Sequence, residues 1–217
     1  MTTGVRLIIF GRQGAGKGTQ CTRLAAHYGV PHISTGDMLR AAVKAGTEFG
    51  RKAKEYMDQG QLLPDDIMVG LVGERLAEPD AATGWLLDGF PRTPPQAEAL
   101  VEITAAAPFN LAINLEVPES VVIDRISNRR VCENCQAIYS VDKPPTHDWT
   151  CDRCGHQVVQ RDDDTIEAVT ARLALYESQT APLRSWFEGR GQLVTIDGTG
   201  SPDEVAESLV AAIEAAR

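Results

Sequence analysis

The sequence predicts an α/β protein with a doubly wound, mostly parallel sheet of about five strands. Short apolar runs alternate along the chain with longer stretches in which apolar residues recur at helical spacing. Strands that alternate with helices in this way are joined by crossover helices, and the strands then lie parallel. We expect strands at 5–10, 32–34, 85–87, 111–116 and 192–196.

Turn and capping signals bound the helices between these strands. A turn at Gly29-Val30-Pro31 ends the first helix, and Ser201-Pro202-Asp203-Glu204 begins the last helix as a capping box with proline at its first position. The apolar residues of this last helix that should be buried are Val205, Leu209, Val210 and Ile213. We expect helices at 20–28, 35–46, 48–59, 64–77, 94–107, 118–130, 164–188 and from 202 onward.

Length and charge limit the class of protein. The 217 residues can hold one sizeable core, so we take 1–217 as a single core with inserted segments. Two of the helices, 48–59 and 64–77, lie between strands of one sheet and indicate a small helical insertion over its edge. The formal net charge of −9 argues against a general affinity for nucleic acid. No apolar run approaches the ~20 residues of a membrane span, and no charged leader with a hydrophobic stretch is visible, so we expect a soluble cytoplasmic protein.

A glycine-rich turn joins the first strand to the first helix, with the sequence Gly11-Arg12-Gln13-Gly14-Ala15-Gly16-Lys17-Gly18-Thr19. Strand, turn and helix together fit the phosphate-binding pattern G-x-x-x-x-G-K-[ST], except that Gly18 occupies the Ser/Thr position and Thr19 follows it. Glycines let successive backbone N–H groups point at a phosphate, the helix N-terminus adds partial positive charge, and Lys17 adds a mobile full charge. The alternative is a merely flexible turn, but the flanking elements and the lysine favour phosphate binding.

Four of the five cysteines have the spacing of a metal site. Fifteen residues separate Cys132-x2-Cys135 from Cys151-x2-Cys154, so two tight turns would close a tetrahedron of thiolates around zinc. The alternatives are four unrelated thiols or two disulfides, which a reducing cytoplasm disfavours. Either His147 or His156 could replace a ligand, although four cysteines need neither, and Cys21 is expected to be a small packed residue. A closed four-thiolate site has no open position, so this zinc should be structural.

Further motifs extend through the chain in order. They are Ser34-Thr35-Gly36-Asp37-Met38-Leu39-Arg40, Asp88-Gly89-Phe90-Pro91-Arg92-Thr93, Asp124-Arg125-x3-Arg129-Arg130, Arg161-x-Asp163-Asp164-x2-Glu167-x4-Arg172 and Asp197-Gly198-Thr199. Together with the glycine-rich turn they resemble the adenylate kinase family over nearly the whole chain, and the cysteine segment resembles the zinc-stapled lid of its long bacterial-type members. The chain departs from that family at Gln13, where proline is usual, and at Gly200, where a larger residue often lies near adenine. We expect little consequence from Gln13 and only a backbone contact at Gly200.

The resemblance implies a reversible phosphoryl transfer from ATP to AMP that gives two ADP, with Mg²⁺ accompanying ATP and one structural Zn²⁺ per chain. It also implies a monophosphate-binding insertion at 34–63, a lid at 131–163, and a monomer that binds neither nucleic acid nor membrane. Catalysis would then depend on positioning and charge neutralisation without a general base. Closure of the lid would exclude water.

The resemblance also assigns roles to individual residues. Those expected to bind ATP are Gly14, Ala15, Gly16, Lys17, Gly18, Thr19, Arg125, Arg129 and Gly200. Those expected to bind AMP are Thr35, Arg40, Leu62, Gly89, Arg92, Gln96, Arg161 and Arg172. The expected catalytic set is Lys17, Asp88, Arg92, Arg129, Arg161 and Arg172, with Asp88 holding the water shell of Mg²⁺. Asp163 and Asp164 would hinge or latch the lid, or would simply begin a helix.

Several of these residues also fit purely structural roles. A salt-bridged helix face would account for Arg125, Arg129 and Arg172. The run Thr93-Pro94-Pro95-Gln96 fits a capping box, which would occupy the Gln96 amide that the resemblance assigns to adenine. We favour AMP as the acceptor, because relatives that use UMP or CMP typically carry Asn where this chain has Thr93.

Two other classes of protein are compatible with parts of the sequence. A regulatory ATP-binding switch would use the glycine-rich turn without a phosphate acceptor, but the second group of phosphate-binding candidates, Arg40, Asp88 and Arg92, argues against it. A zinc ribbon that binds nucleic acid or protein would need a basic or aromatic face. Between the first and last cysteines of the metal site the only basic residues are Lys143 and Arg153.

Overall fold

The computed structural model describes residues 4–59, 61–161 and 164–216. Its centre is a five-stranded parallel sheet in the order β2-β3-β1-β4-β8, which confirms the predicted sheet. Leu7 of β1 lies opposite Leu86 of β3 on one side and Leu111 of β4 on the other, so the first strand of the chain takes the middle of the sheet. The strands are β1 (Arg6–Phe10), β2 (His32–Ser34), β3 (Trp85–Asp88), β4 (Leu111–Glu116) and β8 (Leu193–Asp197).

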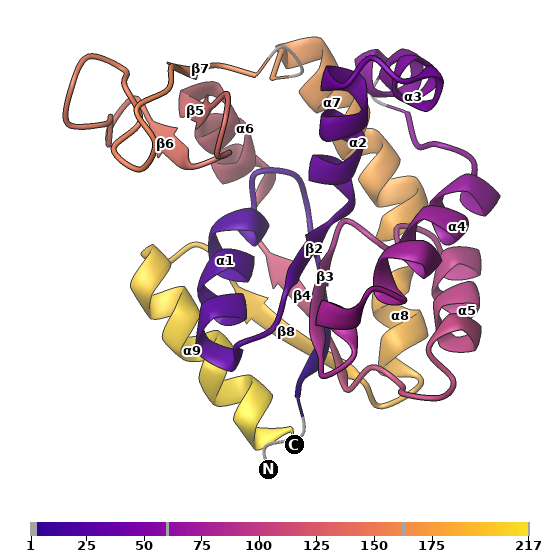
Figure 1. Cartoon of the computed structure of the whole chain (residues 1–217). Coiled ribbons are helices and arrows are strands. Elements are labelled where there is room, and N and C mark those ends of the chain that lie inside the picture. The colour runs from indigo at the N-terminus through magenta and orange to yellow at the C-terminus, as the bar shows by residue number, and fades with distance from the viewer. Residues whose placement is uncertain (1–3, 60, 162–163, 217) are drawn as a thin grey trace.

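Helices cover both faces of this sheet (Figure 1). Alternate residues of β1 point to opposite faces: Leu7 and Ile9 pack under α1, α6, α7 and α9, whereas Ile8 and Phe10 pack under α4, α5 and α8. Burial on both faces explains why the strands are nearly continuous apolar runs. The helices of the sheet's two faces and of the insertion are α1 (Lys17–Tyr28), α2 (Thr35–Lys44), α3 (Glu48–Asp58), α4 (Asp65–Leu76), α5 (Pro94–Ile103), α6 (Glu119–Asn128), α7 (Ile166–Leu175), α8 (Leu183–Glu188) and α9 (Pro202–Ala215), with a short 3-10 helix, Pro79–Ala81, before β3.

Two helices end earlier than predicted. α5 stops at Ile103, and the hydroxyl of Thr104 donates a hydrogen bond to the carbonyl oxygen of Leu100 at 2.8 Å. α6 stops at Asn128, because Arg129 and the residue after it continue as strand β5 (Arg129–Cys132). The second difference matters for function, since it moves a candidate arginine from a helix to the base of a separate small sheet.

The helix predicted over 164–188 is divided into three parts. Between α7 and α8 lies a π-helical segment, Tyr176–Thr180, in which the N–H of Ala181 donates to the carbonyl oxygen of Tyr176 at 2.8 Å. Pro182 follows, and proline lacks an N–H and clashes with the carbonyl four residues earlier. A local π-turn is a common way to accommodate such a defect.

The small sheet is antiparallel, in the order β6-β5-β7, with β6 (Ile138–Ser140) and β7 (Val158–Val159) on either side of β5. The buried apolar residues that it encloses are Cys132, Ala137, Cys151 and Val158. A core of this size is too small to hold a fold by itself and needs a further staple.

Capping and close packing define the remaining helices. The predicted capping box at the start of α9 is present, with Ser201 and Glu204 each bonded to the backbone of the other. In that helix Val210 is only partly buried, whereas the other predicted core residues are buried. The insertion depends on Gly50 of α3, where a Cβ would lie 2.0 Å from the carbonyl oxygen of Ala42 in α2. No helix within the described ranges is long and apolar enough to cross a bilayer.

Candidate functional site

The ends of β1, β2 and β3 bring together motifs that are far apart in the sequence. β1 runs into the glycine-rich turn, β2 into Thr35, and β3 into the run from Asp88 to Arg92. Figure 1 shows the small sheet and helices α2 and α3 beyond this same end of the central sheet. Open α/β sheets bind their ligands in the crevice at this end.

The glycines of the turn have backbone conformations that other residues rarely adopt. The φ angles of Gly11, Gly14 and Gly16 are 146°, 77° and 99°. A Cβ at Gly11 would lie 2.3 Å from the carbonyl oxygen of Leu115, so the turn is packed directly against β4. The helix α1 begins at Lys17, and its unpaired N–H groups therefore face the turn.

The ammonium of Lys17 lies within this turn. Its Nζ donates hydrogen bonds to the carbonyl oxygens of Gly11 at 2.8 Å and Arg12 at 2.9 Å. Burial lowers the pKa of Lys17, and the nearby carboxylate of Asp88 opposes that effect. The end of β3 therefore acts electrostatically on the lysine of the turn.

The run after β3 is tied to the start of the helical insertion. Both the hydroxyl of Thr35 and the Nε of Arg92 donate to the carbonyl oxygen of Gly89 at 2.9 Å. Burial lowers the pKa of Arg92, Asp88 opposes this, and the positive charge of Arg172 adds to it, with a smaller contribution from Arg40. These three guanidinium groups therefore share one region of positive potential.

An ion pair lies on the helical insertion. Arg40 pairs with Asp37 one turn earlier in α2. Burial raises the pKa of Asp37, but the charge and hydrogen bond of Arg40 outweigh burial and hold that pKa below its usual value. The charge of Arg161 contributes to the same lowering, which places this arginine near α2.

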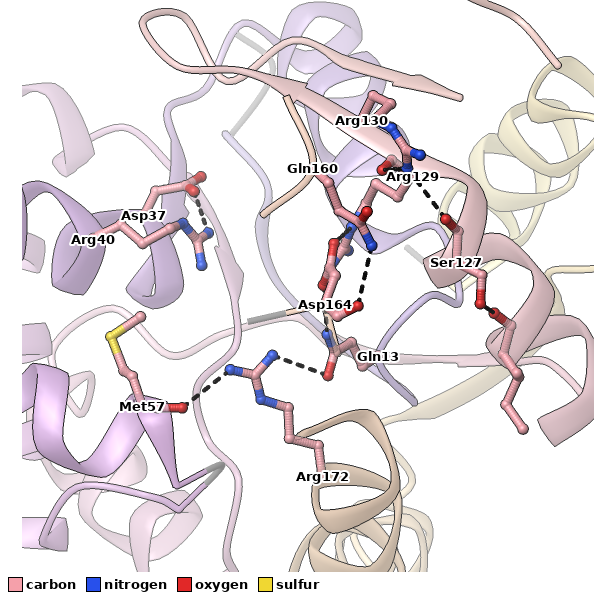
Figure 2. A network of polar contacts seen from close by, with 11 residues as sticks. Gln13, Asp37, Arg40, Met57, Ser127, Arg129, Arg130, Gln160, Asp164 and Arg172 are labelled. Atoms are coloured by element: carbon pink, nitrogen blue, oxygen red, sulfur yellow. Dashed lines mark hydrogen bonds and ion pairs between the residues drawn. The ribbon is translucent and has the colours of Figure 1, made fainter. Parts of the chain in front are cut away.

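A polar network joins the base of the small sheet to the glycine-rich turn (Figure 2). Arg129 binds Asp164 through two nitrogens, with its Nε 2.8 Å from Oδ2, and the Asp164 side chain is fully buried. Gln13 donates from Nε2 to Oδ1 of Asp164 at 3.4 Å and accepts from Nη1 of Arg172 at 3.3 Å. Arg172 also donates to the carbonyl oxygen of Met57 in α3 at 3.4 Å. The turn, the small sheet, α7 and the insertion are thus connected through side chains.

This network differs from the sequence-based expectations in two respects. The sequence predicts little consequence from Gln13, yet its amide contacts residues 151 and 159 positions away. The only feature of the sequence that indicates this role of Gln13 is an amide at a position where the family usually has proline. Arg129 lies on a strand, so the explanation as a salt-bridged helix face is wrong for this arginine. Of the two candidate hinge residues, Asp163 lies outside the described residues.

Arg125 and Gly200 lie beside the turn between β8 and α9. The guanidinium of Arg125 donates to the carbonyl oxygens of Gly198 at 2.9 Å and Thr199 at 3.3 Å. It also lies beside the glycine-rich turn, 3.9 Å from an ideal Cβ position on Gly16. Gly200 is exposed next to these carbonyls. The guanidinium thus joins the glycine-rich turn to the turn after β8.

The amide of Gln96 is buried and held at both ends. Its Oε1 accepts from the backbone N–H of Arg92 at 2.8 Å, and its Nε2 donates to Oδ1 of Asp65 at 2.6 Å. The hydroxyl of Thr93 accepts from the N–H of Gln96, so only this half of the predicted capping box is present. Asp65 is a partner that the sequence did not indicate, because it belongs to a different helix. Leu62 precedes α4, the helix that carries Asp65, and is partly buried.

The four predicted metal ligands converge at the tip of the small sheet. Their sulfur atoms lie within 4.8 Å of one another, with 3.4 Å between Cys132 and Cys154 and 3.5 Å between Cys135 and Cys151. A tetrahedral zinc with Zn–S bonds of about 2.3 Å needs sulfurs about 3.8 Å apart, so the cluster fits zinc. Tyr139 adds an outer contact, since its hydroxyl lies 3.4 Å from Sγ of Cys151.

The alternatives for these cysteines are not supported. All four are free thiols, so the two-disulfide explanation is wrong. Neither His147 nor His156 belongs to the cluster in the described part of the chain, and Nδ1 of His156 instead lies 3.0 Å from the carbonyl oxygen of Cys154. Cys21 is fully buried in the core of the central sheet, as predicted.

Comparison with known proteins gives one consistent result. The family model for adenylate kinase matches residues 9–192. The chain is 50% identical over 213 residues to an adenylate kinase of Carboxydothermus hydrogenoformans, which covers 97% of this chain and all of that protein. It is 49% identical over 213 residues to one of Desulfitobacterium hafniense (97% and 98% covered) and 47% identical over 211 residues to one of Methanosarcina mazei (96% and 98% covered). The glycine-rich turn, the Asp88-to-Arg92 run and the four-cysteine cluster therefore occur in a chain that belongs to the adenylate kinase family.

Proposed function

We propose that this adenylate kinase transfers a phosphoryl group between ATP and AMP in the crevice at the ends of β1, β2 and β3. The observation that carries the proposal is the arrangement of charge around Asp88. Its carboxylate raises the pKa of both Lys17 and Arg92 against the lowering caused by burial. A carboxylate that interacts with both cations suits a site that holds two phosphorylated nucleotides and a hydrated metal ion.

ATP binds at the glycine-rich turn. The backbone N–H groups and the start of α1 hold its phosphates, and Lys17 neutralises the terminal ones. Arg125 packs on the adenine at the mouth of the turn, and Gly200 offers it a backbone contact. The residues assigned to ATP are Gly14, Ala15, Gly16, Lys17, Gly18, Thr19, Arg125, Arg129 and Gly200.

AMP binds between the end of β3 and the insertion at 34–63. Arg40 and Arg92 hold its phosphate as bidentate donors. Gln96 reads the adenine with the second amide hydrogen and the second carbonyl lone pair, because its bonds to Asp65 and to the Arg92 backbone use one of each. The residues assigned to AMP are Thr35, Arg40, Leu62, Gly89, Arg92, Gln96, Arg161 and Arg172.

The transfer step depends on positioning and charge. Lys17 and the arginines at 92, 129, 161 and 172 surround the transferring group and stabilise its charge, and no general base is required. Mg²⁺ carried by ATP supplies further neutralisation, with Asp88 holding its water shell. The lid at 131–163 closes over the site and excludes water, which would otherwise accept the phosphoryl group.

The zinc site maintains the lid and takes no part in the reaction. Four thiolates leave no coordination position for water or phosphate. The small apolar core of the lid explains why a metal is needed there. We expect the protein to act as a monomer.

A coupled assay with ATP, Mg²⁺ and equal concentrations of AMP, UMP, CMP and GMP tests the proposal. AMP should be the preferred acceptor and give two ADP. Preference for a pyrimidine nucleotide would contradict the role of Gln96 and Thr35. Inactivity with every acceptor would favour a regulatory ATP-binding protein.

A further inference from the structure

Three potential metal ligands from three different elements meet behind the glycine-rich turn. They are Cys21 of α1, His32 of β2 and Asp88 of β3. The sulfur, an imidazole nitrogen and a carboxylate oxygen all lie within 4.8 Å of one another. This group is separate from the four-cysteine cluster in the lid.

The imidazole of His32 supplies the second observation. Its Nε2 is buried and has no hydrogen-bond partner among the described residues. The nearest carboxylate oxygen, Oδ2 of Asp88, lies 3.6 Å away, which is too far for a hydrogen bond. Buried polar atoms are nearly always satisfied, so an unpaired imidazole nitrogen aimed at a carboxylate and a thiol requires an explanation.

We propose that Cys21, His32 and Asp88 form a binding site for a transition metal ion of borderline softness, such as Zn²⁺. Occupation of this site inhibits the enzyme. Sulfur, imidazole and carboxylate ligands suit Zn²⁺ and Co²⁺, whereas Mg²⁺ prefers oxygen ligands alone. Tetrahedral bonds of about 2.0–2.3 Å place ligand atoms about 3.3–3.8 Å apart, so no pair within the present limit of 4.8 Å has to approach by more than about 1.5 Å. Three protein ligands leave a fourth position for water or a phosphate oxygen.

Binding at this site releases a proton. The metal binds the thiolate form of Cys21, so a thiol at this position must lose its proton when the metal binds. The metal–sulfur bond forms as the thiol proton leaves to solvent, so the bound metal brings one net positive charge fewer than its own two.

Inhibition follows from the position of Asp88, and this part rests on its proposed role toward hydrated Mg²⁺. A transition metal that takes the carboxylate removes it from that role. The metal also adds positive charge beside Lys17, whose charge already interacts with both Asp88 and Cys21. Free Zn²⁺ should therefore inhibit phosphoryl transfer while the lid retains its own zinc.

The test uses enzyme whose lid is loaded with zinc, equilibrated in metal buffers of rising free Zn²⁺. Wild type is compared with Cys21→Ala and His32→Gln, and His27→Gln is the control, because it removes an exposed imidazole from the same helix α1. Elemental analysis without nucleotides should find a second zinc per chain in wild type and the control. Loss of one ligand should weaken that binding, and the inhibition, by about tenfold or more.

Cobalt gives an independent spectroscopic measurement. Co²⁺ added to the zinc-loaded enzyme should give a thiolate-to-cobalt absorption band that disappears in Cys21→Ala. Zinc stoichiometry, inhibition and cobalt spectra that are the same in wild type, Cys21→Ala and His32→Gln would overturn the proposal. A second metal that binds without inhibiting would retain the site and overturn the inhibition, and thus the role of Asp88.

Discussion

Gln13 accepts a hydrogen bond from Arg172 across 3.3 Å, which links the phosphate-binding turn to helix α7. The same amide donates to Asp164, the partner of Arg129 at the base of the lid. A residue at a position where the family usually has proline thus contacts Asp164 directly and Arg129 through it, as well as Arg172 of α7. Its side chain therefore connects the glycine-rich turn to α7 and, through Asp164, to Arg129 at the start of β5.

Replacing Gln13 should affect the reaction more than the fold. Gln13→Leu removes both contacts and should lower kcat by roughly tenfold. This change corresponds to the lower end of the free energy that a hydrogen bond to a charged group contributes. Gln13→Glu keeps an acceptor for Arg172 but sets a second carboxylate against Asp164, so it should raise the KM for ATP more than it lowers kcat. Steady-state kinetics with separate kcat and KM values decide this. Unchanged values in both variants would show the amide to be incidental.

Lys17→Ala and Arg92→Ala should each lower kcat steeply. Electrostatic donors of this kind contribute about 3–4 kcal/mol to barrier lowering, or roughly 100- to 1,000-fold. The melting temperature should stay nearly constant, because burial lowers the pKa of both side chains and their charged forms are therefore costly to the fold. Lys52→Ala, on the exposed face of α3, is the control. A variant that unfolds early but retains its activity per folded molecule would show that residue to be structural.

Removal of the lid zinc should lower stability without abolishing catalysis. Binding energy at a structural zinc site is folding energy, and a loss of about 2 kcal/mol already shifts the Tm of a chain of this size by roughly 4–8 °C. Zinc is removed with a thiol-reactive agent, its loss is confirmed by elemental analysis, and turnover and melting are then measured together. Below the new Tm the enzyme should turn over with Mg²⁺ and bind ATP more weakly. A folded, zinc-free enzyme that binds both nucleotides normally and transfers nothing would show the zinc to be catalytic.

Gly50→Ala should destabilise the helical insertion formed by α2 and α3, which we propose binds AMP. A Cβ there would lie 2.0 Å from the carbonyl oxygen of Ala42, so α2 and α3 would have to separate, at a cost of about 1–3 kcal/mol. The Tm should fall and the KM for AMP should rise more than that for ATP. Gly70→Ala in α4 is the matched control, since beyond its chain neighbours and the nearby backbone of its own helix no atom of the described residues lies within 4 Å of its Cβ position. It should stabilise the helix by up to about 1 kcal/mol. Equal effects of the two substitutions would contradict the packing argument.

Local signals explain what the sequence could predict. The strands, the phosphate-binding turn, the capping box at Ser201 and the zinc cluster each depend on residues that are close together in the chain or on a fixed spacing. The sequence predicts an uninterrupted helix over 164–188, whereas the structure has a π-helical segment at Tyr176–Thr180 before Pro182. The polar run of this segment carries no apolar pattern that would show the change in helical turn.

The contacts that sequence reasoning missed depend on the tertiary fold. Asp65 orients Gln96 from another helix, and Gln13 meets its partners only after the chain has crossed the sheet several times. The meeting of Cys21 and His32 with Asp88 depends on the strand order, which places β2 and β3 side by side behind α1. No spacing in the sequence encodes these distances.

The central place of β1 also bears on how a nascent chain acquires its structure on the ribosome. β1 emerges first, but Leu7 must wait for Leu86 and Leu111 before either of its edges is covered. The turn that follows it is shaped by Leu115 and by Ile126 of α6, which are made later still. Such long-range pairing is slow to form and leaves apolar edges exposed in the meantime. The phosphate-binding turn is therefore among the earliest parts to be synthesised and among the later ones to take its final shape.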